Sequence, residues 1–334
     1  MLNTIARRVA ATIPVMAIVA LFVFSLLYLA PGDPAAIIAG DQASPADIDR
    51  IRAGLGLDRP FLVRFVEWLW NVLQGNLGTS IFTNLPVTTM IEQRLGPTIS
   101  LMVLTLILSI GLAVPMGVLA AAKQGTWIDR IVMLFAVFGF SIPVFVVGYL
   151  LAYVFALDGL GIADKVGAVF GPAAADAVSN AMLPVQGYTP IARGVGPWLA
   201  NLILPAITLG GVYIALIARI TRATMLEVLS QDYIRTARAK GVGNTTVLFL
   251  HALKNAAVPI VTVIGIGVAL LIGGAVVTES VFAIPGLGRL VVDAILRRDY
   301  PIIQGVVLLF SFVYVLVNLG VDLVYTLVDP RIRY

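Results

Sequence analysis

The sequence predicts an all-α membrane protein that crosses the bilayer six times. Of its 334 residues, 60% are hydrophobic and only 12% are charged, and the mean hydropathy is +1.00. Six stretches without charged residues are long enough to cross a hydrocarbon core of about 30 Å, which takes about 20 helical residues. Each must be helical, because a loop or an open strand would leave backbone groups unpaired in lipid. They are residues 10–29, 96–122, 131–157, 194–218, 255–278 and 300–321.

Residues 1–30 are predicted to form an N-terminal tail and the first span. Arg7 and Arg8 precede the apolar run, as they would in a signal peptide. The run is longer than the core of a signal peptide, and no small-residue cleavage site leads into a polar mature region. We therefore expect a helix that is retained in the mature protein.

Residues 31–95 are predicted to form a small, partly helical subdomain on the external face. Ser44 is placed to cap a helix that begins in the segment SPADIDRIRAGLGLD. Trp68 and Trp70 suit a membrane interface. One face of the helix predicted in RFVEWLWNVL carries Phe65, Trp68, Leu69 and Val72.

Residues 96–328 hold the other five spans and form the transmembrane domain, followed by a tail at 329–334. Proline or glycine interrupts most spans, which membrane helices tolerate where neighbours repair the backbone. The external loop 158–198 is rich in Ala, Gly and Val and has the composition of a re-entrant segment. We favour an outer loop, because it carries Asp164, Lys165 and Asp176.

The distribution of charge predicts the orientation. With both tails, the 123–130 turn and the 219–254 segment inside, the cytoplasmic side carries 12 Lys/Arg against four acids. The other side carries 10 Lys/Arg against 13 acids. Loops rich in Lys and Arg stay in the cytoplasm, so both termini are expected inside. The basic pI of about 9.4 therefore reflects the excess of Lys and Arg on the cytoplasmic side of the membrane. We expect no nucleic-acid partner.

The sequence lacks the residues that several kinds of chemistry require. None of the four lysines follows a glycine, so no phosphate-binding P-loop is present. With no cysteine and one histidine, His251, the chain cannot supply a structural zinc site. We expect no catalytic residue, no metal and no cofactor in this chain, which is not an enzyme by itself. His251 is interpreted as a surface or capping residue.

Residues 230–259 are too polar to span the membrane, and they are not polar enough for a flexible, fully solvated loop. Its cations Arg235, Arg238, Lys240 and Lys254 face the single acid Asp232. We predict two short helices, in which Ser230 caps the first, Gly241 to Gly243 end it, and Asn244 caps the second. A basic hairpin with small residues is suited to docking on another protein. A solvated loop held by anionic lipid is the alternative.

This stretch also carries a resemblance. The segment RTARAKGVGNTTVLFLHALKNA resembles the cytoplasmic docking loop, or EAA loop, of ABC-importer permeases. This form of the docking loop is typical of the dipeptide, oligopeptide, glutathione and nickel subfamily of binding-protein-dependent transport system inner membrane components. Arg235-Thr236-Ala237 stands where the wider superfamily has Glu-Ala-Ala, and Leu253-Lys254 replaces its Leu-Pro. Further matches in order along the chain are IARRVAATIPV, LAPGDPA (29–35), GLGLDRP (54–60), GNLGTSI (75–81), TESVFAIPGLGRLVVDAILRRDYP (278–301) and VDPRIRY.

The resemblance implies a type I ABC-importer permease fold and a set of partners. These are two ABC ATPase subunits that hold ATP and Mg, an extracytoplasmic solute-binding protein, and a second homologous permease that is related but different. It implies a bacterial inner-membrane location and a docking loop over 221–255. The residues expected to contact the ATPase are Tyr233, Arg235, Thr236, Ala237, Arg238, Ala239, Lys240, Gly241, Val242, Thr245, Leu248 and Phe249.

Two further groups are candidate site residues. Asn318 and Asp322 lie four residues apart on the last span and share a face, and we expect Asp322 either to contact Arg219 or Arg222 or to reach cytoplasmic water. A Pro-Gly turn follows the fifth span, where the resemblance implies the outer mouth of the pathway. It is expected to gate the path, to contact the binding protein, or only to pack as a turn. Its residues are Glu279, Phe282, Pro285, Gly286 and Arg289.

The function expected is that of a permease subunit for short peptides or glutathione, which forms half of a pathway that works by alternating access. A nickel-chelate or other small-solute permease of the same subfamily is the alternative, because the sequence does not name the cargo. A stand-alone secondary transporter is disfavoured, since it would place ionisable residues near the bilayer midplane. An intramembrane hydrolase is disfavoured by the single histidine and the absence of cysteine.

Overall fold

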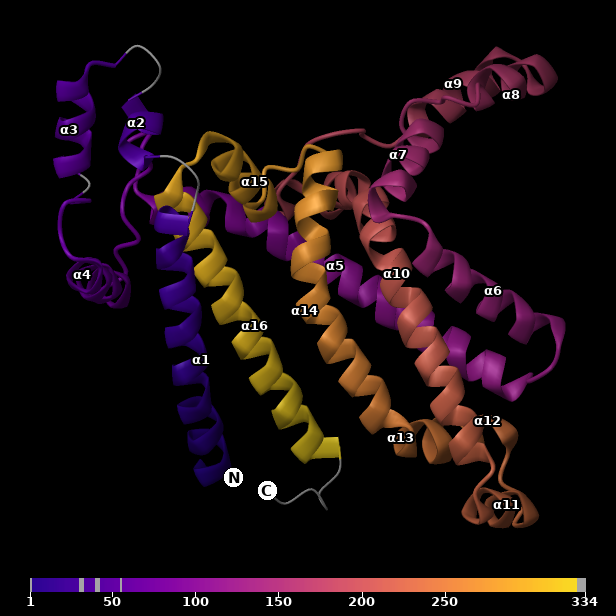
Figure 1. Cartoon of the computed structure of the whole chain (residues 1–334). Helices are drawn as coiled ribbons and strands as arrows, with labels where there is room; N and C mark the ends of the chain where they lie inside the picture. Colours follow the sequence, from indigo (N-terminus) through magenta and orange to yellow (C-terminus); the bar gives the residue numbers. More distant parts are fainter. Residues whose placement is uncertain (1, 30–32, 40–42, 55, 329–334) are drawn as a thin grey trace. The chain divides into compact units, whose positions relative to one another are not determined.

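The structure is a computed structural model that describes residues 2–29, 33–39, 43–54 and 56–328 (Figure 1). Helices dominate these residues, and an isolated antiparallel bridge joins Thr79 and Pro86. The predicted tail 329–334 lies outside them. The helices are α1 Leu2–Leu29, α2 Pro34–Ala39, α3 Pro45–Gly54, α4 Phe61–Leu73, α5 Val87–Ala122, α6 Trp127–Ser141, α7 Val144–Phe155, α8 Ile162–Phe170, α9 Pro172–Ala181, η1 Ile191–Arg193, α10 Val195–Leu229, α11 Asp232–Ala239, α12 Asn244–Thr246, η2 Val247–Ala252, α13 Leu253–Asn255, α14 Ala257–Val281, α15 Leu287–Arg297 and α16 Tyr300–Val328.

Five of these helices are long and apolar enough to span a membrane: α1, α5, α10, α14 and α16. The sixth predicted span, 131–157, is wrong as a single helix. It consists of α6 and α7, which meet at a bend of 107°. Pro143 explains the break, because the residue before a proline is driven out of the helical region, and Ile142 has φ −100° and ψ 125°. At 1.5 Å per residue, α6 and α7 are each shorter than the roughly 30 Å of hydrocarbon.

The chain divides into two compact units. One comprises Met1–Leu95 and Leu290–Leu316, and the other comprises Gly96–Arg289 and Val317–Tyr334. We call them unit 1 and unit 2, and each is described by itself.

Unit 1 is organised around the aromatic contact between α1 and α4. Phe24 of α1 lies against the rings of Phe61, Phe65 and Trp68, with centroids 5.3 to 5.5 Å apart. The predicted shared face of α4 is thus the face that packs. The predicted cap on α3 is confirmed, because the Asp47 N–H donates to the Ser44 hydroxyl and that hydroxyl donates to the Asp47 carboxylate. The hydrogen bonds that the Ser44 hydroxyl and the Ser44 N–H donate to the Asp47 carboxylate hold the pKa of Asp47 below its ordinary value.

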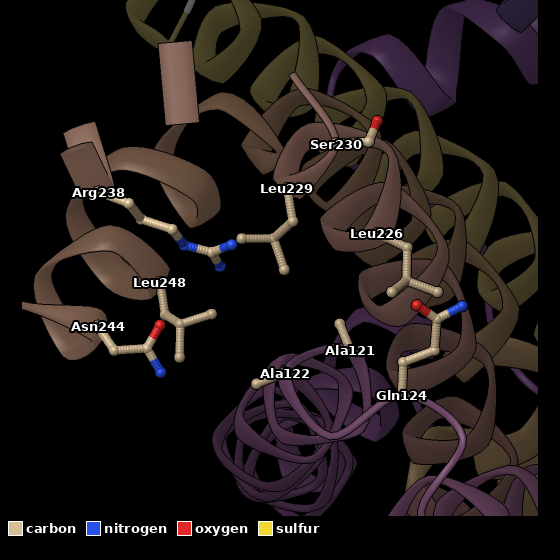
Figure 2. Close-up of a pocket in the computed structure, with 9 residues that line it drawn as sticks. All are labelled: Ala121, Ala122, Gln124, Leu226, Leu229, Ser230, Arg238, Asn244 and Leu248. Atoms are coloured by element: carbon tan, nitrogen blue, oxygen red, sulfur yellow. The ribbon is translucent and has the colours of Figure 1, made fainter. Parts of the chain in front are cut away.

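Unit 2 is built around α10, on which α6, α7 and α14 pack. Of its most apolar window, 61% is buried, the highest fraction among the five long apolar helices. At the Leu229 end of α10, a small cluster buries Met225, Ile234 and Val247. Figure 2 shows Leu248 of η2 directed toward the same space as Leu226 and Leu229 of α10.

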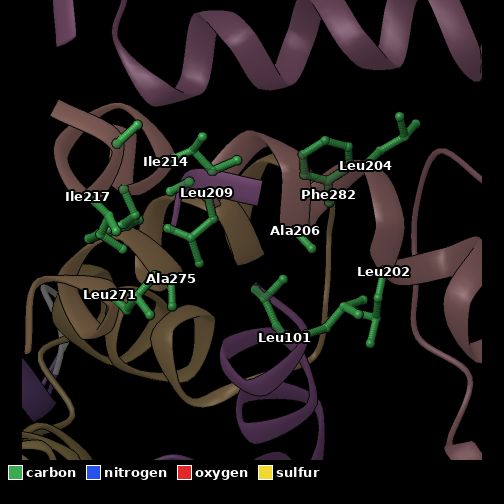
Figure 3. Packing of buried hydrophobic residues seen from close by; sticks show 14 of the residues in the cluster. Leu101, Leu202, Leu204, Ala206, Leu209, Ile214, Ile217, Leu271, Ala275 and Phe282 are labelled. Atoms are coloured by element: carbon green, nitrogen blue, oxygen red, sulfur yellow. The ribbon is translucent and has the colours of Figure 1, made fainter. Parts of the chain in front are cut away.

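A larger core fills the rest of unit 2. Leu209 and Ile217 of α10, Leu101 of α5 and Leu271 of α14 meet there (Figure 3). Small residues let the helices approach closely. A Cβ added at Gly117 of α5 would lie 2.5 Å from the Thr221 Cβ of α10. Close contact through small residues is how membrane helices gain packing energy without a hydrophobic driving force.

Candidate functional site: the α10–α14 hairpin

The predicted docking stretch forms a helical hairpin between α10 and α14 (Figure 1). The span predicted at 194–218 continues as one helix to Leu229, so the predicted docking loop 221–255 begins inside α10. A short turn then leads into α11, followed by α12, η2, α13 and α14. The helices that leave the hairpin on both sides are two of the five long apolar helices. A movement of the hairpin therefore has a direct mechanical connection to both.

Local sequence explains the limits of α11. Asp232 lies in the first turn and Arg238 in the last, where each charge matches the helix dipole. Gly241 adopts φ +79°, so the predicted glycine stop is confirmed. The predicted caps are wrong: Gln231 and Gly243 occupy the N-cap positions of α11 and α12. The Ser230 hydroxyl instead donates to the carbonyl oxygen of Glu227, because Ser230 ends α10.

The hairpin is held by its own apolar contacts. Ile234 is the buried side chain of α11, and Val247, Leu248 and Ala252 are buried in η2. They pack with Val118 and Ala121 of α5, Met225 of α10 and Ile260 of α14. Burying apolar surface contributes about 25 cal/mol per Å². This cluster therefore fixes α11 to the ends of three helices.

The rest of the hairpin carries an exposed, basic surface. Ala237 and Val242 are half-buried and Leu248 is buried, and contact of these three residues with a partner stays a prediction. Leu250, which we did not predict, is exposed beside Phe249. Partial desolvation raises the pKa of the Tyr233 hydroxyl, and a hydrogen bond with the Asn255 side chain acts in the opposite direction. The predicted docking residues that are exposed are Tyr233, Arg235, Thr236, Arg238, Ala239, Lys240, Gly241, Thr245 and Phe249.

A cavity of about 340 Å³ lies between the hairpin and the ends of α5 and α10. Figure 2 shows the Arg238 side chain of α11 directed across it toward Leu229. The walls are apolar at Ala121, Leu226 and Leu248, with Gln124, Ser230 and Asn244 adding polar groups. The face of α11 that meets α10 is therefore less densely packed than the cluster around Ile234.

Near this end of α10, Arg222 has a partner that the sequence did not indicate. Its guanidinium binds the Asp129 carboxylate of α6 through Nε and through Nη2, the latter at 2.8 Å. Asp129 is buried and also accepts a hydrogen bond from the Gly125 N–H. The Arg219 guanidinium lies 5.5 Å from the centre of the Phe140 ring. The expected contact of Asp322 with Arg219 or Arg222 stays a prediction.

The Pro-Gly turn of unit 2 is a packed junction organised by Glu279. Glu279 is fully buried and accepts hydrogen bonds from the Thr98 hydroxyl, at 2.6 Å, and the Arg289 N–H, at 3.0 Å. The Thr98 hydroxyl in turn accepts a hydrogen bond from the Leu287 N–H at 2.8 Å. A Cβ on Gly286 would collide with the Glu279 carboxylate.

Pro285 and Gly286 form the predicted turn between α14 and α15. Phe282 is also buried. Of the three roles expected for this turn, the burial of Glu279 and Phe282 fits packing as a turn, and gating or contact with the binding protein stays a prediction.

Unit 1 has a buried carboxylate of its own, Asp299, which the sequence analysis missed. Asp299 accepts hydrogen bonds from the Ser80 hydroxyl, at 2.5 Å, and from the Ile81 N–H, at 3.3 Å. It thereby ties the loop closed by the Thr79–Pro86 bridge to the junction of α15 and α16. Ser80 and Asp299 belong to two motifs of the resemblance, GNLGTSI and RRDYP, and the hydrogen bond brings these two segments into contact.

The long apolar helices and the anchored basic hairpin define a multi-pass membrane protein of the transport-permease class. A profile of the family described as binding-protein-dependent transport system inner membrane component matches residues 113–334. A profile of the N-terminal region of such components matches residues 1–102. The chain belongs to this family and is a multi-pass component of the inner membrane.

Relatives match along the full length. A probable peptide ABC transporter permease protein of Sinorhizobium fredii is 56% identical over 330 residues, with 99% of each chain covered. A putative peptide transport system permease protein of Brucella abortus is 46% identical over 99% of this chain and 98% of the relative. The glutathione transport system permease protein GsiC of Salmonella choleraesuis is 41% identical over the whole of both chains.

The fold also resembles a solved structure. A chain of the MetNI methionine ABC transporter in an inward-facing conformation superposes with a TM-score of 0.52 and 16% identity. The match covers 72% of this chain and 96% of that one. The predicted type I importer fold is therefore confirmed.

Proposed function

We propose that this chain is the permease subunit of an ATP-driven importer for short peptides or a peptide-like solute such as glutathione. The names of the full-length relatives support the cargo class. The anchored hairpin between α10 and α14 carries the proposal, because it offers a partner a basic surface with mechanical continuity into two spans. The ATPase pair holds ATP and Mg, and this chain contributes no catalytic group.

That geometry supports a mechanism of alternating access. When two ATPase subunits close on ATP, each pulls on a hairpin seated in its surface, and the spans above rotate to open the path away from the cytoplasm. Cargo then enters from a solute-binding protein, and hydrolysis reverses the movement. Because one hairpin engages one ATPase, the complete transporter contains a second homologous permease, and each chain forms half of the path.

The experiment that tests this proposal places bulk on the exposed surface of α11. Gly241 is a poor position, because its φ of +79° strains any other residue and would distort the hairpin itself. Ala239 is exposed, so Ala239→Trp leaves the apolar cluster around Ile234 intact. The matched control is Ala53→Trp, another exposed helical alanine, on α3.

The variants are expressed with the ATPases, the partner permease and the binding protein, and the complex is purified through this chain. We expect Ala239→Trp to lose the co-purified ATPase and uptake of labelled dipeptide or glutathione, while Ala53→Trp retains both. Unchanged ATPase recovery with Ala239→Trp would contradict docking through α11. Uptake by this chain expressed alone would contradict the assignment as a subunit.

A further inference from the structure

The helix α4 presents three different surfaces around its circumference. At 3.6 residues per turn, Leu62, Val66, Trp70 and Leu73 fall on one side, and they are 70%, 62%, 62% and 71% exposed. We call these four residues the apolar stripe. Glu67 and Asn71 follow on the next sector and are exposed polar residues. The remaining sector carries the aromatic residues that pack on α1.

The aromatic sector fixes where α4 sits along α1. Phe61, Phe65 and Trp68 contact Phe24, and Phe61 also lies 5.1 Å from the Tyr28 ring centre. Phe24 lies five residues before Leu29, where α1 ends. At a rise of 1.5 Å per residue, the contact of α4 with Phe24 therefore lies about 7.5 Å below the end of a helix long and apolar enough to span a membrane.

This depth is that of an interfacial helix. Amphipathic helices that lie in a membrane bury their apolar face about 5–10 Å into the boundary between headgroups and acyl chains. Within one turn of Phe24, α1 exposes Leu21 and Phe22, and α1 is long and apolar enough to span a membrane. Tryptophan, the residue type of Trp70, is enriched at the membrane interface.

We propose that α4 lies in the membrane interface, with the apolar stripe in the acyl chains of the leaflet that meets the Leu29 end of α1. Its occupant is lipid. The polar sector, with Glu67 in an ion pair with Arg59, then faces the aqueous side. The segment between α1 and α5 is consequently anchored to the bilayer at two points, the end of α1 and the length of α4.

The test uses the absence of cysteine from the chain, so that each introduced cysteine is the only one in this subunit. A nitroxide is attached to Val66→Cys and Leu73→Cys in the apolar stripe, and to Glu67→Cys and Asn71→Cys in the polar sector. Phe22→Cys on α1 is the lipid reference. The complete transporter is placed in bilayers of phosphatidylethanolamine and phosphatidylglycerol. Accessibility to dissolved oxygen and to a water-soluble nickel chelate is then measured by power saturation.

We expect the two stripe positions to match Phe22→Cys, with high oxygen and low chelate accessibility, and chelate accessibility several-fold below that at positions 67 and 71. High chelate accessibility at the stripe would overturn the proposal, because it places the stripe in water. Low accessibility to both reagents would also overturn it, because it places the stripe against protein. If either label disturbs assembly, Leu62→Cys gives the same comparison.

Discussion

At Glu279, one buried carboxylate sets the shape of the turn between α14 and α15. Its oxygens accept hydrogen bonds from Thr98 and the Arg289 backbone, and Gly286 leaves the space that the carboxylate fills. An acid buried at the end of a span is costly unless its oxygens are satisfied. The hydrogen-bond network at this turn therefore depends on Glu279, Thr98 and Gly286 together.

We predict that Glu279→Ala destabilises this junction. Each buried donor left without an acceptor costs about 1–3 kcal/mol, and the missing side chain leaves a cavity in addition. Glu279→Gln keeps the shape and one acceptor, so its loss is smaller. The measurement is the thermal unfolding midpoint of the purified protein, with Glu92→Ala, an exposed acid on α5, as the control. Equal midpoints for Glu279→Ala and Glu92→Ala would contradict the role.

The buried acids show what residue patterns predict and what they do not. A glycine stop at Gly241 and a serine cap at Ser44 were predictable, because both act on neighbours in the chain. Asp129 and Asp299 find partners 93 and 219 residues away. In the sequence each is an ordinary polar residue beside an apolar run. Their roles depend on which segments become neighbours in the fold. The local sequence pattern does not encode this.

At the scale of elements, α5 and α10 meet through a glycine. A methyl group at Gly117 would lie 2.5 Å from the Thr221 Cβ and 2.7 Å from the Ala218 carbonyl oxygen. The backbone oxygen cannot move without shifting α10. Gly111 of the same helix is exposed and has no heavy atom within 4 Å of the added carbon.

We predict opposite effects for alanine at these two glycines. Gly117→Ala forces the helices apart, and overpacking of this kind costs about 1–3 kcal/mol. Gly111→Ala adds no contact and gains up to about 1 kcal/mol of helix propensity. Thermal unfolding midpoints of the two variants, measured in the same detergent, give the comparison. If both variants shift in the same direction and by the same amount, α5 and α10 are not in the contact described.

Elements differ in how well the sequence predicted them. Five spans were found because hydropathy over about 20 residues is a strong signal. The sixth was interpreted as one helix across Pro143, where the chain bends by 107°. A proline inside an apolar run is compatible with both a kink and a break, and neighbouring contacts decide between them. The apolar stripe on α4 was not predicted.

At the scale of the whole molecule, the class of protein was available from composition, hydropathy and ordered motifs. The packing of the spans was not, because helices such as α5 and α14 are apolar on every side and their sequence does not mark which side meets a neighbour. The asymmetry of charge is a different kind of information. It concerns the molecule as a whole, and it predicts orientation without reference to packing.

We predict that the hairpin faces the cytoplasm and the segment between α1 and α5 faces the opposite side. Loops rich in Lys and Arg resist transfer across the membrane, and the hairpin carries Arg235, Arg238, Lys240 and Lys254 against Asp232. Because the chain has no cysteine, Lys240→Cys and Asp58→Cys, both at exposed positions, give unambiguous labels. A maleimide that cannot cross membranes is applied to spheroplasts before and after lysis. We expect Asp58→Cys to react in intact spheroplasts and Lys240→Cys to react only after lysis. The reverse pattern would place α11 outside, where no cytoplasmic ATPase reaches it, and would contradict the proposed mechanism together with the orientation.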